Sequence, residues 1–267
     1  MNTPKTSICR CCGSSAPYSL SGTLLEQHIE YFECVLCGYV QTEDPQWLDI
    51  AYAQAINDSD TGIMQRNQAN SRIVLSCLLL LGRLNGVVVD CAGGYGILVR
   101  LLRDYGINAL WSDPYCANIF AKGFEWTTER ADLVTAFEVF EHFVDPADEL
   151  DKLLSIAPNV LISTLLISEP APKQDDWWYY GREHGQHIGF FRVRTLEKLA
   201  ASRGKYLVSN GNSYHLITDL KINRFLWKAM ILANRLIPLV VIGRVKSKVR
   251  SDYNQLIHNI DSTDLGR

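Results

Sequence analysis

The sequence predicts an α/β fold with a doubly wound, mainly parallel sheet, and three observations support this. Short Val-, Ile- and Leu-rich stretches alternate with stretches of helical apolar spacing between about residues 70 and 220. The chain has 267 residues, which suits one such domain with a small appendage. Apolar residues make up 47% of it, enough for a sizeable core.

The expected elements follow from apolar spacing and from breakers such as Gly and Pro. We expect strands at 87–91, 109–112, 124–126, 133–138, 160–167, 206–209 and 215–218, and helices at 47–56, 70–84, 97–105, 146–156 and 195–202. The last two strands are joined by Asn210-Gly211-Asn212, so we expect them to form an antiparallel pair at one edge.

Residues 87–98 form the stretch around which the chain is organised: a strand, a glycine-rich turn and the start of a helix. Glycine lets the backbone approach a ligand, and a helix N-terminus offers free N–H groups, so this arrangement is typical of nucleotide binding. Asp113 lies 23 residues after Asp90, where an acid can accept ribose hydroxyls. The alternative is an ordinary strand-to-helix turn with glycines for packing. A nicotinamide fingerprint is disfavoured, because Val99 replaces its third glycine.

Two Cys-x-x-Cys-Gly motifs predict a small N-terminal zinc ribbon. Each motif places two sulfurs on one side of a tight turn, and two such turns supply four tetrahedral ligands. The predicted ligands are Cys9, Cys12, Cys34 and Cys37. A zinc ion with all four positions filled is structural and not catalytic. The alternatives are reduced or redox-active thiols, and Cys11 in place of Cys9 or Cys12.

Charge and hydropathy limit the partners. The net charge of −3 does not favour nucleic-acid binding by the whole chain. No run reaches the length of a membrane span and the first residues are polar, so we expect a cytoplasmic protein. Residues 221–250 hold eight Lys and Arg and no acid, interleaved with apolar runs. Such a segment can contact the inner face of a membrane. The alternative is a helical pair packed on the main domain.

Several motifs resemble those of the class I S-adenosylmethionine-dependent methyltransferases. They are the turn Asp90-Cys91-Ala92-Gly93-Gly94-Tyr95-Gly96, Asp113, the run Phe-Glu-Val-Phe-Glu-His-Phe-Val-Asp-Pro at 137–146, and Gly-Gln-His-Ile-Gly-Phe-Phe at 185–191. The resemblance covers about residues 70–220 and implies a seven-stranded Rossmann-like sheet. Zinc knuckles ahead of such a domain resemble a bacterial subgroup that modifies sugars and polysaccharides.

The resemblance implies S-adenosylmethionine as cofactor and Zn²⁺ as structural metal. It assigns cofactor binding to Asp90, Ala92, Gly93, Gly94, Gly96, Asp113 and Glu138. Ala92 departs from the family pattern, in which the first motif position is glycine, and Gly93 stands beside it. Alanine is small enough to keep the backbone close to the ligand, so we expect binding to survive. The alternative for Glu138 is a carboxylate at a helix start.

The expected organisation has four parts. Residues 1–45 form the zinc ribbon and 46–69 a linker with one short helix. Residues 70–220 form the cofactor-binding methyltransferase domain, and 221–267 a basic, apolar helical extension.

Residues 177–187 are too aromatic and polar for a plain linker, and we expect them to bind the acceptor. A histidine near neutral pKa can remove an acceptor proton as general base. We rank His187 first, His184 second and His142 third, with Tyr180 as a helper. The alternative for each histidine is a hydrogen-bonded structural role.

These features predict S-adenosylmethionine-dependent methyl transfer to a small hydroxylated acceptor, a sugar nucleotide or glycan intermediate. Another hydroxylated ring is a related possibility. An RNA-modifying methyltransferase or a zinc-ribbon nucleic-acid-binding protein is an alternative, although residues 1–40 carry only Lys5 and Arg10 as bases. A non-catalytic cofactor-binding scaffold is a third interpretation.

Overall fold

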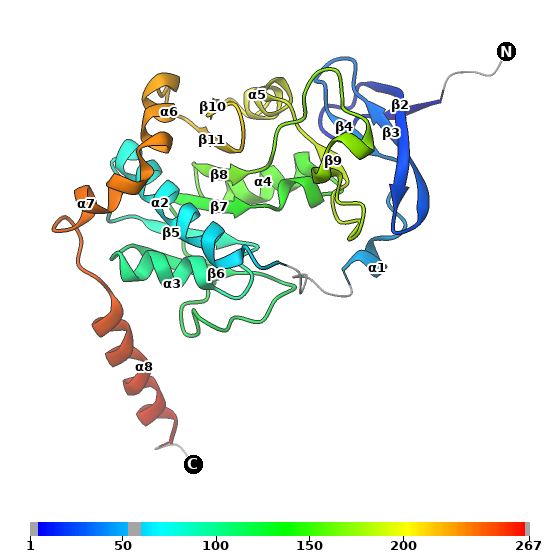
Figure 1. The fold of residues 1–267 in the computed structure, drawn as a ribbon. Helices are drawn as coiled ribbons and strands as arrows, with labels where there is room; N and C mark the ends of the chain where they lie inside the picture. The colour runs from blue at the N-terminus through cyan, green and yellow to red at the C-terminus, as the bar shows by residue number, and fades with distance from the viewer. Residues whose placement is uncertain (1–4, 53–59, 265–267) are drawn as a thin grey trace. The chain divides into compact units, whose positions relative to one another are not determined.

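The computed structural model describes residues 5–52 and 60–264 (Figure 1). The chain forms two compact units, each assembled from separate parts of the sequence. The first unit contains residues 1–59 and 136–228, and the second contains 60–135 and 229–267. The four-part division expected from the sequence stays a prediction.

Three parallel strands form the centre of the second unit. β5 (Val87–Cys91) lies between β6 (Asn108–Ser112) and β7 (Leu133–Phe137). The helices α2 (Ile63–Leu81) and α3 (Ile97–Asp104) contact each other, and α3 also contacts β6. α2 begins seven residues before the predicted start. The prediction began too late because the first turns of α2 are mostly polar and carry no apolar periodicity.

The predicted strand at 124–126 is reduced to one isolated bridge between Trp111 and Glu125. Two backbone hydrogen bonds form it, from the Trp111 N–H to the Phe124 carbonyl at 2.8 Å and from the Trp126 N–H to the Trp111 carbonyl at 2.7 Å. The main sheet therefore has six strands in the described residues, where seven were expected.

The first unit holds the antiparallel part of this sheet. β11 (Tyr214–Thr218) pairs with both β8 (Val160–Ser163) and β10 (Tyr206–Ser209), which confirms the predicted antiparallel pair. At the end of β7 the Glu138 N–H donates to the Ser163 carbonyl at 3.1 Å. The strand order is β10-β11-β8-β7-β5-β6, and the boundary of the two units falls inside β7. Helices α4 (Pro146–Ile156) and α5 (Val193–Ala201) belong to the first unit.

The N-terminal strands form a second, antiparallel sheet in the first unit. Its order is β1 (Thr6–Ile8), β2 (Ser15–Leu24), β3 (Gln27–Glu33), β4 (Val40–Thr42) and β9 (Gly189–Phe190). Leu25 and Glu26 join β2 to β3 with φ of 48° and 65°, as a tight hairpin requires. α1 (Leu48–Ala51) lies inside the helix expected at 47–56, of which residues 53–56 fall outside the described residues.

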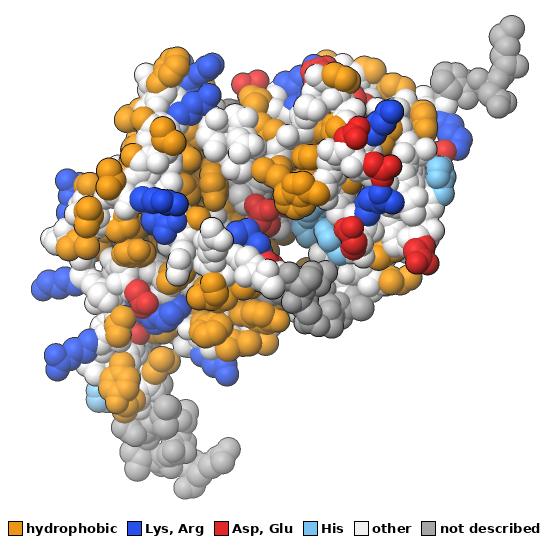
Figure 2. Space-filling view, in the orientation of Figure 1, with side chains coloured by type: hydrophobic (Ala, Val, Ile, Leu, Met, Phe, Trp, Pro, Cys, Tyr) orange, Lys and Arg blue, Asp and Glu red, His pale blue; other side chains and the backbone are white. Residues whose placement is uncertain are grey.

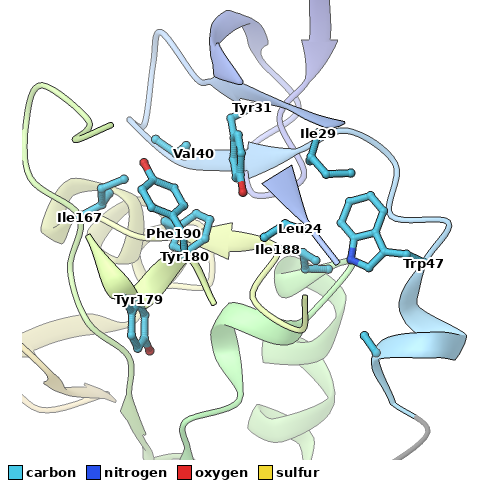
Figure 3. Packing of buried hydrophobic residues seen from close by; sticks show 11 residues of the cluster. Leu24, Ile29, Tyr31, Val40, Trp47, Ile167, Tyr179, Tyr180, Ile188 and Phe190 are labelled. Atoms are coloured by element: carbon cyan, nitrogen blue, oxygen red, sulfur yellow. The ribbon is translucent and has the colours of Figure 1, made fainter. Parts of the chain in front are cut away.

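One apolar cluster packs the N-terminal sheet against the segment that follows β8 (Figure 3). Tyr31 from β3 contacts the rings of Tyr180 and Phe190, at centroid distances of 5.3 and 6.2 Å. The Trp47 Nε1–H donates to the Gly185 carbonyl at 2.8 Å. Two short 3-10 helices, η2 (Gln174–Asp176) and η3 (Trp178–Tyr180), lie in this segment. The ribbon and residues 177–190 thus share one core, which fixes the segment expected to bind the acceptor.

The C-terminal extension is helical: α6 (Arg224–Leu232), η4 (Asn234–Leu236), α7 (Ile237–Val241) and α8 (Val249–Asp264). Arg103 of α3 donates through Nε and Nη2 to the two carboxylate oxygens of Asp252 in α8, both at 2.7 Å and both buried. This bidentate pair attaches α8 to α3. Among the described helices, none combines the length and apolar character that crossing a membrane demands.

Candidate active site

Three residues with left-handed backbone turn the chain from β5 into α3. Ala92, Gly94 and Gly96 have φ of 57°, 54° and 84°, and Gly96 stands directly before the helix. Glycine adopts this conformation freely, whereas a side chain costs roughly 1 kcal/mol or more. Ala92 therefore holds a conformation that glycine would adopt freely, at an energetic cost.

Asp113, at the end of β6, is bonded to this turn. Its Oδ2 accepts from the Gly94 N–H at 2.8 Å. Its Oδ1 accepts from the N–H groups of Tyr115 at 2.7 Å and Cys116 at 3.0 Å. A carboxylate offers about four acceptor positions. Three are used, so Asp113 can take one ribose hydroxyl here, and a second requires the bond to Gly94 to open.

Asp90 lies buried beneath the turn. The Thr135 hydroxyl donates to Asp90 Oδ1 at 2.6 Å. Burial raises the pKa of Asp90 to about 7, and the hydrogen bond from Thr135 opposes that rise. A Cβ on Gly93 would lie 3.0 Å from Asp90 Oδ2 and 2.9 Å from Trp111 Cδ1. The absence of a side chain at Gly93 therefore lets the turn close over this carboxyl group.

Three histidines gather in the first unit. His142 ends the 3-10 helix η1 (Phe140–His142), which follows β7, and His187 precedes β9. The His187 ring lies 4.9 Å from that of His142 and 4.8 Å from that of His184, centroid to centroid. The three histidines ranked from the sequence are thus neighbours.

Hydrogen bonds assign opposite tautomers to His187 and His184. His187 Nδ1 lies 2.6 Å from the Tyr179 carbonyl oxygen, which can only accept, so Nδ1 carries the proton and Nε2 keeps its lone pair. His184 Nδ1 accepts from the Gln186 N–H at 3.1 Å, so the proton of its neutral ring is on Nε2. His187 can accept a proton at Nε2, whereas the only lone pair of neutral His184 already accepts from the Gln186 N–H.

Burial keeps these histidines neutral. It lowers the pKa of His187, and the charge of Glu138 partly opposes this effect. It lowers the pKa of His184 to about 4 and that of His142 well below its usual range. Burial also raises the pKa of Glu141 to about 7, against the effect of the Tyr179 hydrogen bond. At neutral pH the three imidazoles are therefore uncharged.

The two adjacent tyrosines point to different places. The Tyr180 hydroxyl donates to the Pro172 carbonyl at 2.9 Å, and its ring lies in the apolar cluster. Tyr179 turns its hydroxyl away from the other labelled rings (Figure 3) and donates to Glu141 Oε1 at 2.6 Å. Sequence reasoning selected Tyr180 and did not select Tyr179 or Glu141. The available signal was the Glu141-His142 pair directly after a strand of the sheet.

Glu138 directly follows β7 and has a left-handed backbone, φ 52°, which is unusual for a side-chain-bearing residue. Its N–H lies 2.9 Å from the Ser163 hydroxyl oxygen, and that hydroxyl donates to the Glu138 carboxylate. The negative charge of Glu138 favours the protonated form of His187. Its expected contact with the cofactor stays a prediction.

Four cysteine sulfurs converge in the N-terminal sheet. The Sγ atoms of Cys9, Cys12, Cys34 and Cys37 all lie within 4.8 Å of one another. The Cys9–Cys37 and Cys12–Cys34 distances are 3.6 and 3.5 Å. A tetrahedral zinc with Zn–S bonds of about 2.3 Å places its sulfurs about 3.8 Å apart, so this donor set fits Zn²⁺. Cys11 is buried but is not part of the set.

The two cysteine turns have matching geometry. Gly13 and Gly38 have φ of 70° and 72°. Their N–H groups donate to the carbonyls of Cys9 and Cys34, both at 2.9 Å. Each glycine thus closes a turn that presents two sulfurs on one side.

Residues 64–210 match the family model described as a methyltransferase domain. The chain belongs to the S-adenosylmethionine-dependent methyltransferases. This match covers more than half of the sequence and includes the glycine turn, Asp113 and the three histidines. No curated protein sequence matches this methyltransferase.

Solved structures similar to this methyltransferase share little sequence with it. Magnesium protoporphyrin IX methyltransferase from Synechocystis PCC 6803 with bound SAH is 13% identical over 65% of this chain and 94% of its own, with a TM-score of 0.42. An O-methyltransferase family protein from Burkholderia thailandensis is 13% identical over 67% and 64%, with a TM-score of 0.44. The bifunctional kinase-methyltransferase WbdD is 18% identical over 68% and 43%, with a TM-score of 0.38.

Proposed function

We propose that this methyltransferase methylates a hydroxyl group of a small acceptor, a sugar nucleotide or glycan intermediate, and that His187 is the general base. The observation that carries the proposal is the His187 tautomer, which leaves a neutral lone pair on Nε2. Trp178, whose ring lies 5.4 Å from that of Tyr179, is 77% exposed. A flat, exposed aromatic ring suits stacking on the apolar face of a sugar.

When bound, the cofactor supplies an electrophilic methyl group, so the protein has to bind, orient and deprotonate. Asp113 accepts from the ribose, and Gly94 and Gly96 let the main chain approach the ligand. Asp90 supports the turn from below. His187 Nε2 removes the acceptor hydroxyl proton, a contribution worth roughly 100- to 10,000-fold in rate.

We also propose that Cys9, Cys12, Cys34 and Cys37 hold one structural Zn²⁺. The sulfur distances and the paired glycine turns support this assignment. The ion would fix the N-terminal sheet, which shares its core with residues 177–190, and so stabilise the acceptor segment.

Nucleic-acid binding by the ribbon is not favoured. Lys5 pairs with Glu30. The Arg10 guanidinium donates to the carbonyls of Thr42 at 3.1 Å and Ile188 at 2.9 Å. Because both bases of the ribbon have partners within the protein, they offer little for phosphate contacts.

We propose a further contact, between residues 221–250 and an anionic membrane surface at the cytoplasmic face. Leu232 and Leu239 are 88% and 69% exposed. Figure 2 shows hydrophobic side chains along α6 and α7 beside Lys and Arg. Because the segment contains no acidic residue, its charge complements anionic headgroups.

The experiment is transfer of a labelled methyl group from S-adenosylmethionine to nucleotide sugars, phenolic acceptors and RNA in parallel. We expect turnover with nucleotide sugars and at least a 100-fold loss in His187→Ala, with cofactor affinity unchanged. His28→Ala, an exposed histidine on β3, is the matched control. Turnover of phenolic acceptors or RNA alone would contradict the sugar proposal. Normal cofactor affinity without turnover on any class would indicate a scaffold.

A further inference from the structure

A second group of metal-ligating side chains lies in the first unit, apart from the four cysteines. One ligand atom each from Glu141, His142 and His187 lies within 4.8 Å of the others. Two imidazoles and one carboxylate are the donor set of many divalent transition-metal sites that keep open positions. We propose that Glu141, His142 and His187 bind one divalent transition-metal cation through Glu141 Oε2 and the Nε2 atoms of both histidines.

Hydrogen bonds already orient both imidazoles for this role. The Tyr179 carbonyl fixes the Nδ1 proton of His187, so Nε2 is the free donor atom. The Tyr52 hydroxyl lies 2.8 Å from His142 Nδ1. When this hydroxyl accepts the Nδ1 proton, His142 Nε2 carries the lone pair that a metal needs. Metal-bound histidines typically hold their second nitrogen in such a hydrogen bond, which sets tautomer and ring orientation. His184 has the opposite tautomer and is not among the proposed ligands.

Glu141 supplies the independent observation. Its side chain is 0% exposed, and its Oε1 accepts from the Tyr179 hydroxyl at 2.6 Å. Its Oε2 is buried and has no hydrogen-bond partner among the described residues. A buried carboxylate oxygen without a donor is costly, and a cation beside it removes that cost. The hydrogen bond on Oε1 also aims the carboxylate, as outer hydrogen bonds to metal-bound carboxylates do.

Three protein ligands leave coordination positions open. A catalytic role for this metal rests on the proposed function. The acceptor hydroxyl would occupy an open coordination position, where the metal lowers the pKa of that hydroxyl and the hydroxyl proton leaves to solvent water. His187 Nε2 has one lone pair, so with the metal bound His187 is a ligand and the metal replaces it in activating the hydroxyl, whereas without the metal His187 is the general base. Metal binding itself does not depend on which acceptor is methylated.

Mn²⁺ is the appropriate probe, because it prefers carboxylate and imidazole ligands to thiolates and is visible by electron paramagnetic resonance. We would titrate protein that carries one equivalent of zinc per chain, enough for the four cysteines alone, with Mn²⁺ and measure free and bound metal. We expect one tightly bound Mn²⁺ per chain and couplings to imidazole nitrogen in the pulsed spectrum. Glu141→Gln keeps the side-chain shape and should weaken binding more than about 100-fold, since it removes a direct ligand. Tyr179→Phe should weaken it about 10- to 100-fold.

His28→Ala should bind Mn²⁺ as the parent does. Melting curves of each variant, recorded without Mn²⁺, separate lost metal binding from lost folding. Absent Mn²⁺ binding, binding without imidazole couplings, or an unchanged affinity in a folded Glu141→Gln would overturn the proposal. Titration of the same samples with S-adenosylmethionine keeps the tests distinct. A sample that binds the cofactor and not Mn²⁺ refutes the metal site alone and leaves His187 as the base.

Discussion

The Gly94 N–H donates to Asp113 Oδ2 at 2.8 Å, so the acid expected to bind the ribose also holds the glycine turn. The Trp111 Nε1–H also donates to the Gly94 carbonyl at 2.9 Å, and the Gly93 N–H donates to the Ser112 carbonyl at 3.3 Å, so three hydrogen bonds connect the end of β6 to the turn after β5. Ribose binding through both hydroxyls would compete for the same carboxylate oxygen. The cofactor would then release Gly94, whose N–H becomes free for the ligand.

Asp113→Ala should weaken S-adenosylmethionine binding about 10- to 100-fold, because it removes hydrogen bonds from a charged acceptor worth about 1.5–3 kcal/mol. Calorimetric titration of parent and variant measures this directly. Glu129→Gln, which changes an exposed carboxylate of the same unit, is the matched control and should bind normally. Equal affinities in the parent and Asp113→Ala would remove Asp113 from the cofactor site.

Substitutions at the neighbouring positions Ala92 and Gly93 should change the stability of the protein in opposite directions. Ala92→Gly relieves a left-handed alanine and should raise the free energy of unfolding by up to about 1 kcal/mol, with cofactor affinity kept. Gly93→Ala places a Cβ against Asp90 and Trp111 and should lower both stability and cofactor affinity. Denaturant unfolding and calorimetry test the pair. The turn geometry described here would be wrong if Gly93→Ala were tolerated as well as Ala92→Gly.

Asp90 predicts a pH-dependent stability difference. Its pKa is about 7 in the folded protein against an ordinary value of 3.8, so between these values the folded state holds a proton that the unfolded state releases. Its contribution to stability therefore falls as pH rises through this window and is constant above pH 7. Asp90→Asn does not titrate. Between pH 3.8 and about 7, the free energy of unfolding of Asp90→Asn relative to the parent should therefore increase by about 1.4 kcal/mol for each unit by which the pH is raised.

Denaturant unfolding of parent and Asp90→Asn at several pH values measures this difference. Because every other titrating group is common to both proteins, the comparison isolates Asp90. A stability difference that stays level from about pH 5 to pH 7 would mean that Asp90 is ionised throughout.

The cysteine turns predict one zinc per chain. Cys34→Ser should reduce the zinc content to near zero and lower the melting temperature, because a structural zinc contributes directly to folding free energy. Cys11→Ser should keep the full zinc content, since Cys11 is outside the four-sulfur set. Elemental analysis of purified protein gives both values. Loss of zinc in Cys11→Ser would assign Cys11 as a ligand.

Membrane contact through α6 and α7 can be tested in the full chain. The double substitution Leu232→Glu and Leu239→Glu, at two exposed positions, should abolish flotation with anionic vesicles, because it adds negative charge to the apolar surface. Met64→Glu, also at an exposed apolar position, should float like the parent. A parent protein that stays in the bottom fraction at low salt would refute the contact.

The apolar spacing and the turn residues of the sequence correctly predicted the elements that interactions between neighbouring residues stabilise. The apolar runs of β5 and β6, the helical spacing of α3 and the Asn210-Gly211-Asn212 turn lie where the sequence placed them. The expected strand at 124–126 has the same kind of local signal but forms only a bridge to Trp111. Whether a run becomes a strand depends on how far a partner strand extends beside it, which local sequence does not encode.

The sequence by itself determined the family, the α/β class and the positions of the glycine turn and cysteine turns, because these depend on local spacing and backbone conformation. Only the tertiary structure decided which of the two tyrosines donates to Glu141 and which nitrogen of His187 carries the proton. Tyr179 and Tyr180 are adjacent in sequence, and packing against Tyr31 and Phe190 places Tyr180 in the core. Tyr179 bonds to His187 through the fold of a loop. Tyr52 bonds to His142, which is distant from it in sequence. No periodicity reports such contacts, because they arise only when separate segments share one core.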